Sequence, residues 1–273
     1  MIPFTRALIA WMIFWGQPGE KQNTEWQQYW QTYDQKLPRI YRVVKNNAFQ
    51  AGESLEYKVK FGFITAGSAT FQIPEIITYE NRPSYRIVVK METNGTFSTV
   101  FKVRDWITTY VDVKGLFPWY FERRIHEGSY RRHDRIDFDH YHKKAFTTKD
   151  TLDIDPYTQD TISIIYYTRV LSLSVGDKID ITNYSPNKVY HLRLEIDRRE
   201  KIKVPAGTFD CYHIKPGIQP GYDEEARGQM ELWVTADERK IPVQVKTDLP
   251  FGSLTMKLEN YKGIAGNQLV SKP

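Results

Sequence analysis

Apolar and polar residues alternate along the first half of the chain. In SLEYKVKF (54–61) every second residue is apolar, and the pattern returns in the stretches 69–73, 85–91 and 106–113. A period of two predicts strands with one buried and one solvated face, and such strands form antiparallel sheets.

The same pattern predicts strands along the rest of the chain. Two long strands are expected at 119–127 and 129–140, with residues 127–128 at the turn between them. Others are expected at 177–184, 188–198, 199–204, 208–215, 228–235, 241–248 and 252–261, because turns rich in Pro, Gly and Asn separate these stretches. We therefore expect a mainly β fold: a strongly curved antiparallel sheet or open barrel of about 12 strands, with one inserted helix and a short N-terminal helix.

Two segments have helical periodicity. Residues 160–173 place apolar side chains on one stripe, with Asp160 or Thr161 as the candidate N-cap and Gly176 as a stop signal. Residues 20–47 carry Trp and Tyr at the spacing i, i+3, i+4, i+7 of one helix face. The first segment predicts a buried helix within the β protein. The second predicts a helix packed on the domain, with an interfacial helix as the alternative.

The N-terminus has the features of a targeting segment. Arg6 gives a charged start, an apolar run of about ten residues follows, and residues 17–19 break the run. This order is typical of a secretory signal peptide, and the run is too short to span a bilayer. Because an A-x-A cleavage site is missing, an uncleaved anchor and a non-targeting start stay open.

These features define an expected domain organisation. We expect a signal peptide (1–19), a helical lead-in (20–47), one antiparallel β domain (48–263) and a C-terminal tail (264–273). The expected location is periplasmic or secreted, in a Gram-negative bacterial envelope, and no transmembrane span is expected.

The stretch FGFITAGSATF (61–71) contains two glycines between alternating segments. We interpret residues 64–67 as the tight connection of a hairpin. Gly67 is then expected to supply either a positive φ or a close approach of two backbones.

Composition and charge limit the partners and the kinds of site that the chain can have. The net charge of +5 and the isoelectric point near 9.0 do not by themselves indicate a nucleic-acid partner, and none is expected. Cys211 is the only cysteine, which excludes an intramolecular disulfide and a multi-cysteine metal site. The basic run RREKIK (198–203) is interpreted as a solvated hairpin face. As its partner, an anionic glycan or lipid headgroup fits better than RNA or DNA.

Short motifs occur in a fixed order along the β domain. They lie at residues 52–57, 66–69, 105–112, 116–118, 127–128, 138–139, 166–169, 205–211, 232–243 and 252–253. The ordered set resembles the family called domain of unknown function 3108 over essentially the whole domain. The resemblance implies a secreted or periplasmic bacterial protein. It supplies no catalytic residues or cofactor, because most members have no assigned activity.

Four histidines lie beside three aspartates, a composition that could bind zinc or copper: His126, His133, His140 and His142. Strand alternation places these side chains on two faces, and the arginines among them would repel a cation. We therefore expect a salt-bridged hairpin and no metal.

Candidate catalytic groups are few. Cys211 and His213 share one face of a predicted strand, but a thiolate–imidazole pair also needs an orienting group and a cleft. We expect Cys211 to be a buried core thiol. Carboxylates of the type that glycosidases use occur at Glu53, Glu56, Asp105 and Glu122, without a pattern that pairs them. No catalytic residue and no cofactor is predicted, so the chain is not expected to be an enzyme.

The predicted fold suggests a binding or carrier module for an apolar ligand such as lipid or a lipoprotein. Aromatic side chains would line its pocket: Phe61, Phe63, Phe71, Phe97, Phe101, Trp106, Trp119 and Phe121. Two alternatives stay open. One is an envelope structural or protein-interaction module, recognised by an exposed apolar patch without a pocket. The other is a hydrolase of envelope glycans or lipids. The oligomeric state is unknown.

Overall fold

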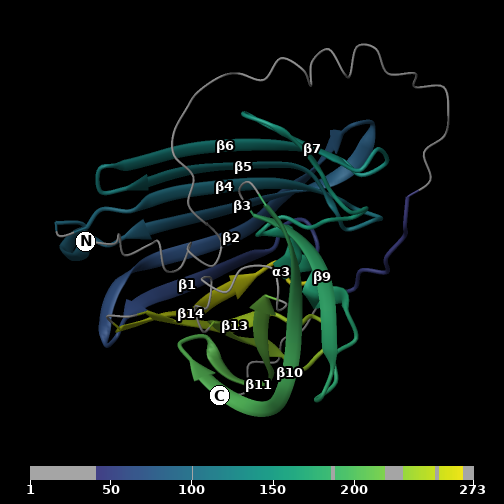
Figure 1. Cartoon of the computed structure of the whole chain (residues 1–273). Coiled ribbons are helices and arrows are strands. Elements are labelled where there is room, and N and C mark those ends of the chain that lie inside the picture. Colours follow the sequence, from purple (N-terminus) through teal and green to yellow (C-terminus); the bar gives the residue numbers. More distant parts are fainter. Residues whose placement is uncertain (1–40, 100, 186–187, 219–229, 250–251, 267–273) are drawn as a thin grey trace.

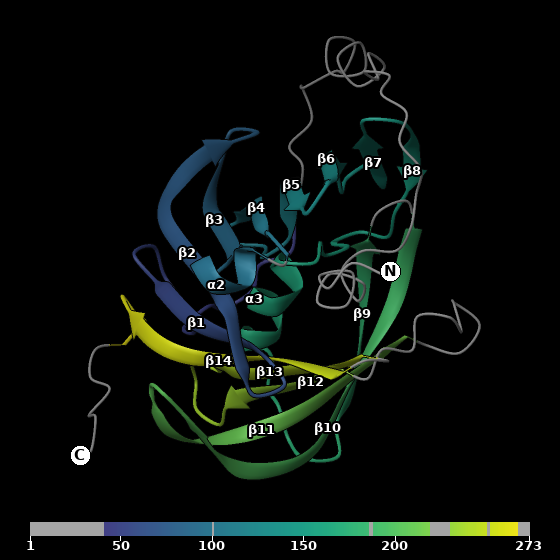
Figure 2. The same ribbon diagram turned by 90° about the vertical axis from the view of Figure 1, so that its left-hand side faces the viewer.

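The computed structural model describes residues 41–99, 101–185, 188–218, 230–249 and 252–266. Their strands form one antiparallel sheet of 14 strands that curls around a helix (Figures 1 and 2). The spatial order is β8-β7-β6-β5-β4-β3-β2-β1-β14-β13-β12-β11-β10-β9. The bounds are β1 Ser54–Phe61, β2 Ile64–Tyr79, β3 Arg82–Thr93, β4 Arg104–Asp112, β5 Pro118–Glu127, β6 Tyr130–Asp139, β7 Lys144–Thr147, β8 Thr151–Asp153, β9 Lys178–Ser185, β10 Lys188–Val204, β11 Gly207–Ile218, β12 Met230–Thr235, β13 Pro242–Leu249 and β14 Gly252–Lys262.

The mainly β fold is confirmed, and the number of strands is slightly larger than expected. Residues 188–204 form the single strand β10 instead of two strands. A bulge between Ile196 and Arg198 shifts the register, which interrupts the alternation in the sequence. The short strands β7 and β8 were not predicted, because three or four residues carry too little periodicity.

The sheet curls until its two edges approach each other without closing. Gln159, which follows β8, forms a parallel bridge with Asn183 of β9. Its N–H donates to Thr182 O at 2.9 Å, and its carbonyl accepts from Tyr184 N at 2.7 Å. Figure 2 shows the resulting curled sheet with the helix α3 on its inner side.

The predicted internal helix is present as α3, Ser163–Val170, with a shorter second helix, α2, at Gly95–Ser98. The N-cap of α3 is Ile162, whose side chain makes no capping hydrogen bond, and not Asp160 or Thr161 as expected. Asp160 still holds the start of the helix, because its Oδ1 accepts from the backbone N–H groups of Ile162 and Ser163 at 2.7 and 2.8 Å. The predicted signal peptide and most of the predicted N-terminal helix lie outside the described residues. Residues 41–47, the described part of the lead-in, contain no helix.

The hairpin in FGFITAGSATF has its turn in a different place from the one expected. β1 ends at Phe61, β2 begins at Ile64, and Gly62 has the positive φ of +56°. Gly67 instead lies within β2, where an added Cβ would be 2.1 Å from Glu92 O on β3. The expected close approach of two backbones at Gly67 is therefore present, within a strand and not in a turn.

The far end of the β10–β11 hairpin folds back against the outer face of the sheet. Ala206 N donates to Leu258 O of β14 at 3.1 Å, and Val204 and Cys211 are buried in one cluster with Trp233. Part of the outer face is therefore buried, while α3 and the main core cover the inner face.

Candidate functional site

Two motifs that are far apart in the sequence meet at α3. Arg169 of α3 donates to both carboxylate oxygens of Glu53 at 2.6 and 2.8 Å, and to the carbonyls of Ala48 and Arg239 at 3.0 and 2.9 Å. Neither side chain of the pair is more than 1% exposed. Burial acts to lower the pKa of Arg169, but the Glu53 carboxylate outweighs it and the pKa is raised. The pair fixes α3 to the sheet and is closed to any substrate.

A second motif contact holds the start of α3. Thr109 of β4 donates to Asp160 Oδ2 at 2.6 Å, while the other oxygen of Asp160 accepts from Ile162 N at the start of the helix. Burial raises the pKa of Asp160, although these hydrogen bonds oppose the shift. Residues of the motifs therefore build the seat of the helix.

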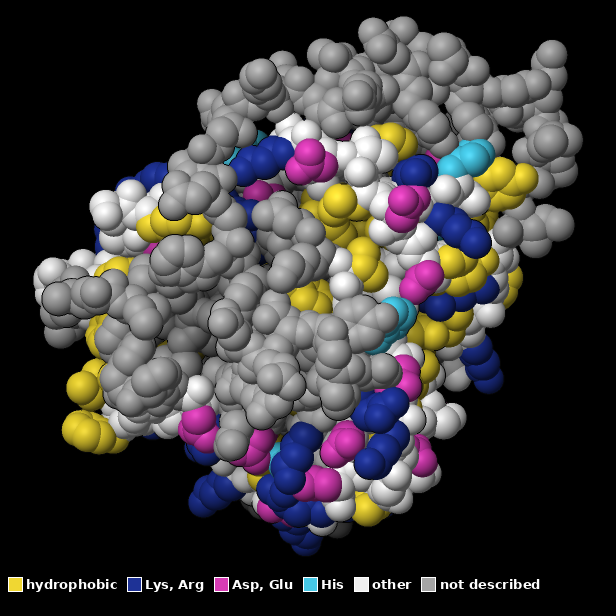
Figure 3. Space-filling model, viewed as in Figure 1, with side chains coloured by type: hydrophobic (Ala, Val, Ile, Leu, Met, Phe, Trp, Pro, Cys, Tyr) yellow, Lys and Arg dark blue, Asp and Glu magenta, His cyan; other side chains and the backbone are white. Residues whose placement is uncertain are grey.

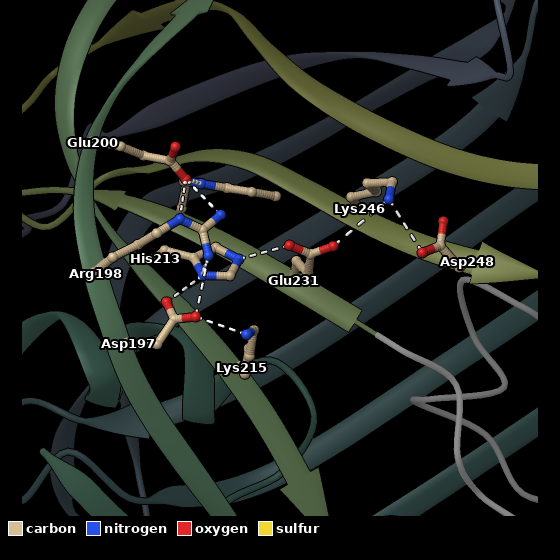
Figure 4. A network of polar contacts seen from close by, with 9 residues as sticks. Asp197, Arg198, Glu200, His213, Lys215, Glu231, Lys246 and Asp248 are labelled. Carbon is tan, nitrogen blue, oxygen red and sulfur yellow. Dashed lines mark hydrogen bonds and ion pairs between the residues drawn. The ribbon is translucent and has the colours of Figure 1, made fainter. Parts of the chain in front are cut away.

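The arrangement that most resembles an active site surrounds His213 on β11 (Figure 4). Its Nδ1 lies 2.5 Å from Asp197 Oδ1 on β10, and its Nε2 lies 2.7 Å from Glu231 Oε2 on β12. Burial acts to raise the pKa of Asp197, but hydrogen bonds from Lys215 and His213 lower it to about 2. The His213 ring is fully buried, whereas Asp197 and Glu231 are partly exposed, and the network ties three strands together.

Cys211 is not an activated nucleophile. It is fully buried, and its Sγ donates to Phe209 O at 3.6 Å. Burial raises the pKa of the thiol to about 12, so the reactive thiolate is scarce at neutral pH. This agrees with the expectation of a core thiol.

The histidine-rich segment also has structural partners. His133 Nε2 lies 2.7 Å from Glu122 Oε1 on the outer face, and His142 Nδ1 lies 2.6 Å from Asp139 Oδ2, where β6 ends. His140 is buried among aromatic rings. Within the described ranges, no three His, Cys, Asp or Glu side chains are grouped as a metal site requires.

Two of the candidate glycosidase carboxylates, Asp105 and Glu122, lie on opposite faces of the sheet. Asp105 lies on the inner face, where its Oδ1 accepts from His126 N at 2.9 Å and burial raises its pKa to about 6. Glu122 lies on the outer face and binds Arg124 at 2.9 Å. Because a glycoside must lie between its two carboxyl groups, Asp105 and Glu122 cannot act as such a pair.

The eight aromatic residues predicted to line a pocket lie at several separate places. Phe71 and Phe121 pack in the main core, and Trp119 is buried against Phe117 and Tyr41. The others are at least partly exposed: Phe61, Phe63, Phe97, Phe101 and Trp106. Trp106 is on the outer face, because its neighbour Ile107 is in the core.

One pocket among the described residues is small and has charged residues in its lining. It lies against β6, β7 and β9 and is lined by Asp134, Arg135, Ile136, Thr147, Thr148, Lys149 and Tyr184. Its empty volume is about 260 Å³, open solvent included, with space for about one water molecule. Its charged lining does not suit an apolar ligand.

The clearest exposed apolar feature is the end of the β1–β2 hairpin, at the lower left in Figure 1. Phe63 is 91% exposed and the adjacent Ile64 is 49% exposed. Hydrophobic side chains protrude at the same margin of the molecule in Figure 3. Gly62 N donates to Ser253 O of β14 at 2.9 Å, which holds the hairpin end in place. The sequence analysis included Phe63 among the pocket residues because it is aromatic. Its exposure could not be predicted, because the alternation of apolar and polar residues along a strand does not show how exposed a turn residue is.

By its fold, this is a curled antiparallel β protein with a helix on its inner face. The family described as "Protein of unknown function (DUF3108)" matches residues 56–259, and this chain belongs to it. The structure is similar to a beta-barrel-like protein of domain of unknown function DUF1849 from Brucella abortus, with 11% identity and a TM-score of 0.51. That similarity covers 82% of this chain and 99% of the other.

Other comparisons add little. A structure from Parabacteroides distasonis, described as a "putative lipoprotein", has 12% identity and a TM-score of 0.36, over 82% of this chain and 100% of that one. No curated protein matches the sequence. Within the described residues, no helix has the length and hydropathy needed to cross a membrane.

Proposed function

We propose that this protein is a non-catalytic module of the bacterial cell envelope that attaches to a lipid surface through the end of its β1–β2 hairpin. The observation that carries the proposal is the exposure of Phe63 beside Ile64 at the tip of that hairpin. Burying a large apolar side chain fully is worth about 1.5–3 kcal/mol, so two neighbours in a lipid layer give a measurable attraction.

The surroundings of the tip fit a membrane interface. Lys60 precedes the turn and is partly exposed. Lysine side chains beside an apolar tip can reach the headgroups while the tip enters the acyl region. The signal-like N-terminal segment of the sequence supports an envelope location, periplasmic or secreted.

A carrier that holds the same ligand inside the curled sheet is the related alternative. It needs an apolar pocket of roughly 300 Å³ or more. In the described part of the chain, α3 occupies the inner face with a buried ion pair at its base, and the pocket near Tyr184 is small and has charged residues in its lining. We therefore place the lipid contact on the hairpin end.

The test is co-sedimentation of the purified, processed protein with phosphatidylcholine vesicles. We expect the double variant Phe63→Ser/Ile64→Ser to bind at least about tenfold more weakly than the wild type, because it loses the apolar contact. The matched control is Ile76→Ser, which removes an apolar side chain of the same strand that is also 49% exposed.

We expect the control to bind as the wild type does. Equal binding by the wild type and the double variant would place the lipid contact elsewhere. A wild type that stays in the supernatant would overturn the proposed function altogether.

A further inference from the structure

A hairpin tip with two apolar side chains gives only weak, reversible attachment, and stable membrane binding by soluble proteins generally needs a second attraction. The outer face of β3–β6 carries a surface that can provide it. The inference below rests on the proposed function and names the lipid class.

The strand registers align cationic side chains across the outer face. Lys90 is opposite Trp106, Trp106 is opposite Arg124, and Arg124 is opposite His133. Arg104 is two residues before Trp106 and shares its face, while Arg131 is two residues before His133. We call this set the basic patch: Lys90, Arg104, Trp106, Arg124 and Arg131.

All five side chains of the basic patch are exposed. Arg104 makes no hydrogen bond or ion pair with any residue in the described ranges. Lys90 Nζ lies 4.2 Å above the centre of the Trp106 ring, and Trp106 is itself 42% exposed. An aromatic ring with a cation beside it suits the boundary between acyl chains and headgroups.

Positive charge is in excess at this end of the face. The carboxylates on the same rows are Glu92 and Glu122, and Glu122 already binds Arg124 and His133. Farther along the same face the charges balance, because Arg86 pairs with Glu75 and Arg135 pairs with Asp137. The excess is therefore local and does not simply reflect the net charge.

The basic patch lies at the same end of the molecule as the hairpin tip. Register places Lys58 of β1 level with Ser68, Glu92 and Arg104 on the next three strands. Gly62 and Phe63 form the turn side by side, so the hairpin tip extends about four residues beyond this level, roughly 13 Å. In Figure 1 the β1–β2 and β5–β6 turns both lie at the left, and in Figure 2 this end faces the viewer.

We infer that the basic patch binds the headgroups of anionic lipids when the hairpin tip enters the bilayer. A membrane that receives Phe63 lies across the ends of β3–β6, which brings Arg104 and Arg124 near its surface. Negative surface potential attracts such side chains within about a Debye length, roughly 10 Å. The two contacts together give a tighter attachment than either one alone.

The experiment compares vesicles of phosphatidylcholine alone with vesicles that also contain phosphatidylglycerol, at low and high salt. We expect the wild type to prefer the anionic vesicles at low salt and to lose that preference at high salt. The variant Arg104→Gln/Arg124→Gln should bind anionic vesicles roughly tenfold to thirtyfold more weakly and phosphatidylcholine as before.

The matched control is Arg193→Gln/Arg199→Gln, which removes the same charge from exposed positions on β10. It should keep most of the anionic preference. If both double variants lose the same affinity for anionic vesicles, the inference that the basic patch binds the headgroups is wrong, and the preference is an effect of net charge. No preference in the wild type would overturn it too, while binding to phosphatidylcholine would still support the hairpin contact.

The remaining possibility is that the basic patch binds an anionic polysaccharide, and a soluble one tests this. If polygalacturonate binds the protein as tightly as anionic vesicles do, and this binding needs Arg104 and Arg124, the inferred ligand class is wrong. Failure of that polysaccharide to bind supports lipid headgroups.

Discussion

His140 shows how a single buried side chain can be mistaken for a metal ligand in the sequence. Its Nε2 lies 2.6 Å from Pro118 O and its Nδ1 accepts from Tyr157 N at 3.1 Å, so the neutral ring carries its proton on Nε2. Phe117 and Phe138 pack on the ring at centroid distances of 4.7 and 5.7 Å. Burial lowers the pKa of His140 to about 4.

This shift predicts a pH dependence of folding. A histidine with a lowered folded pKa binds more protons when unfolded, so its contribution to stability is complete above about pH 6.5 and is lost as the pH falls to about 4. The loss is at most roughly 3 kcal/mol. Urea unfolding from pH 7 to 4 should show a smaller decline for His140→Gln than for the wild type. His126→Gln, at an exposed position, should follow the wild type, and parallel curves for all three proteins would refute the assignment.

At the scale of elements, the position of α3 depends on the buried pair between Arg169 and Glu53. Arg169→Met leaves the Glu53 carboxylate buried without its cation and should lower the free energy of unfolding by about 3–5 kcal/mol. Adding Glu53→Gln should recover part of this loss, measured by urea unfolding. The surface variant Arg193→Met should leave stability nearly unchanged. A double variant as unstable as the sum of the single ones would show that the two residues are not coupled.

The β2–β3 contact depends on a residue without a side chain. Gly67→Ala places a Cβ 2.1 Å from Glu92 O, so the two strands must separate locally. We expect a loss of about 1–3 kcal/mol in unfolding free energy. Gly95→Ala is the matched control, because its Cβ would meet nothing within 4 Å. A thermal midpoint of Gly67→Ala that equals that of the control would contradict the close approach.

Across the whole molecule, alternation in the sequence was sufficient to predict the antiparallel sheet and the inserted helix. It could not locate the turn at Gly62, because Ile64 and Thr65 continue the strand although both are exposed. It also could not pair Glu53 with Arg169 or align Lys90, Trp106 and Arg124, because such neighbours are set by strand order and register. Candidate surfaces can therefore be identified only when the strand order and register are known.

The approach of Gln159 to β9 has a consequence for how the protein behaves at high concentration. A sheet edge with free backbone groups can add strands from another chain and so begin aggregation. One edge of this sheet is β8, which has only three residues, and the other is β9, whose Thr182 and Tyr184 bond to Gln159. Loosening the segment around Gln159 would thus expose backbone groups of β9 and make this edge a template for strands of another chain.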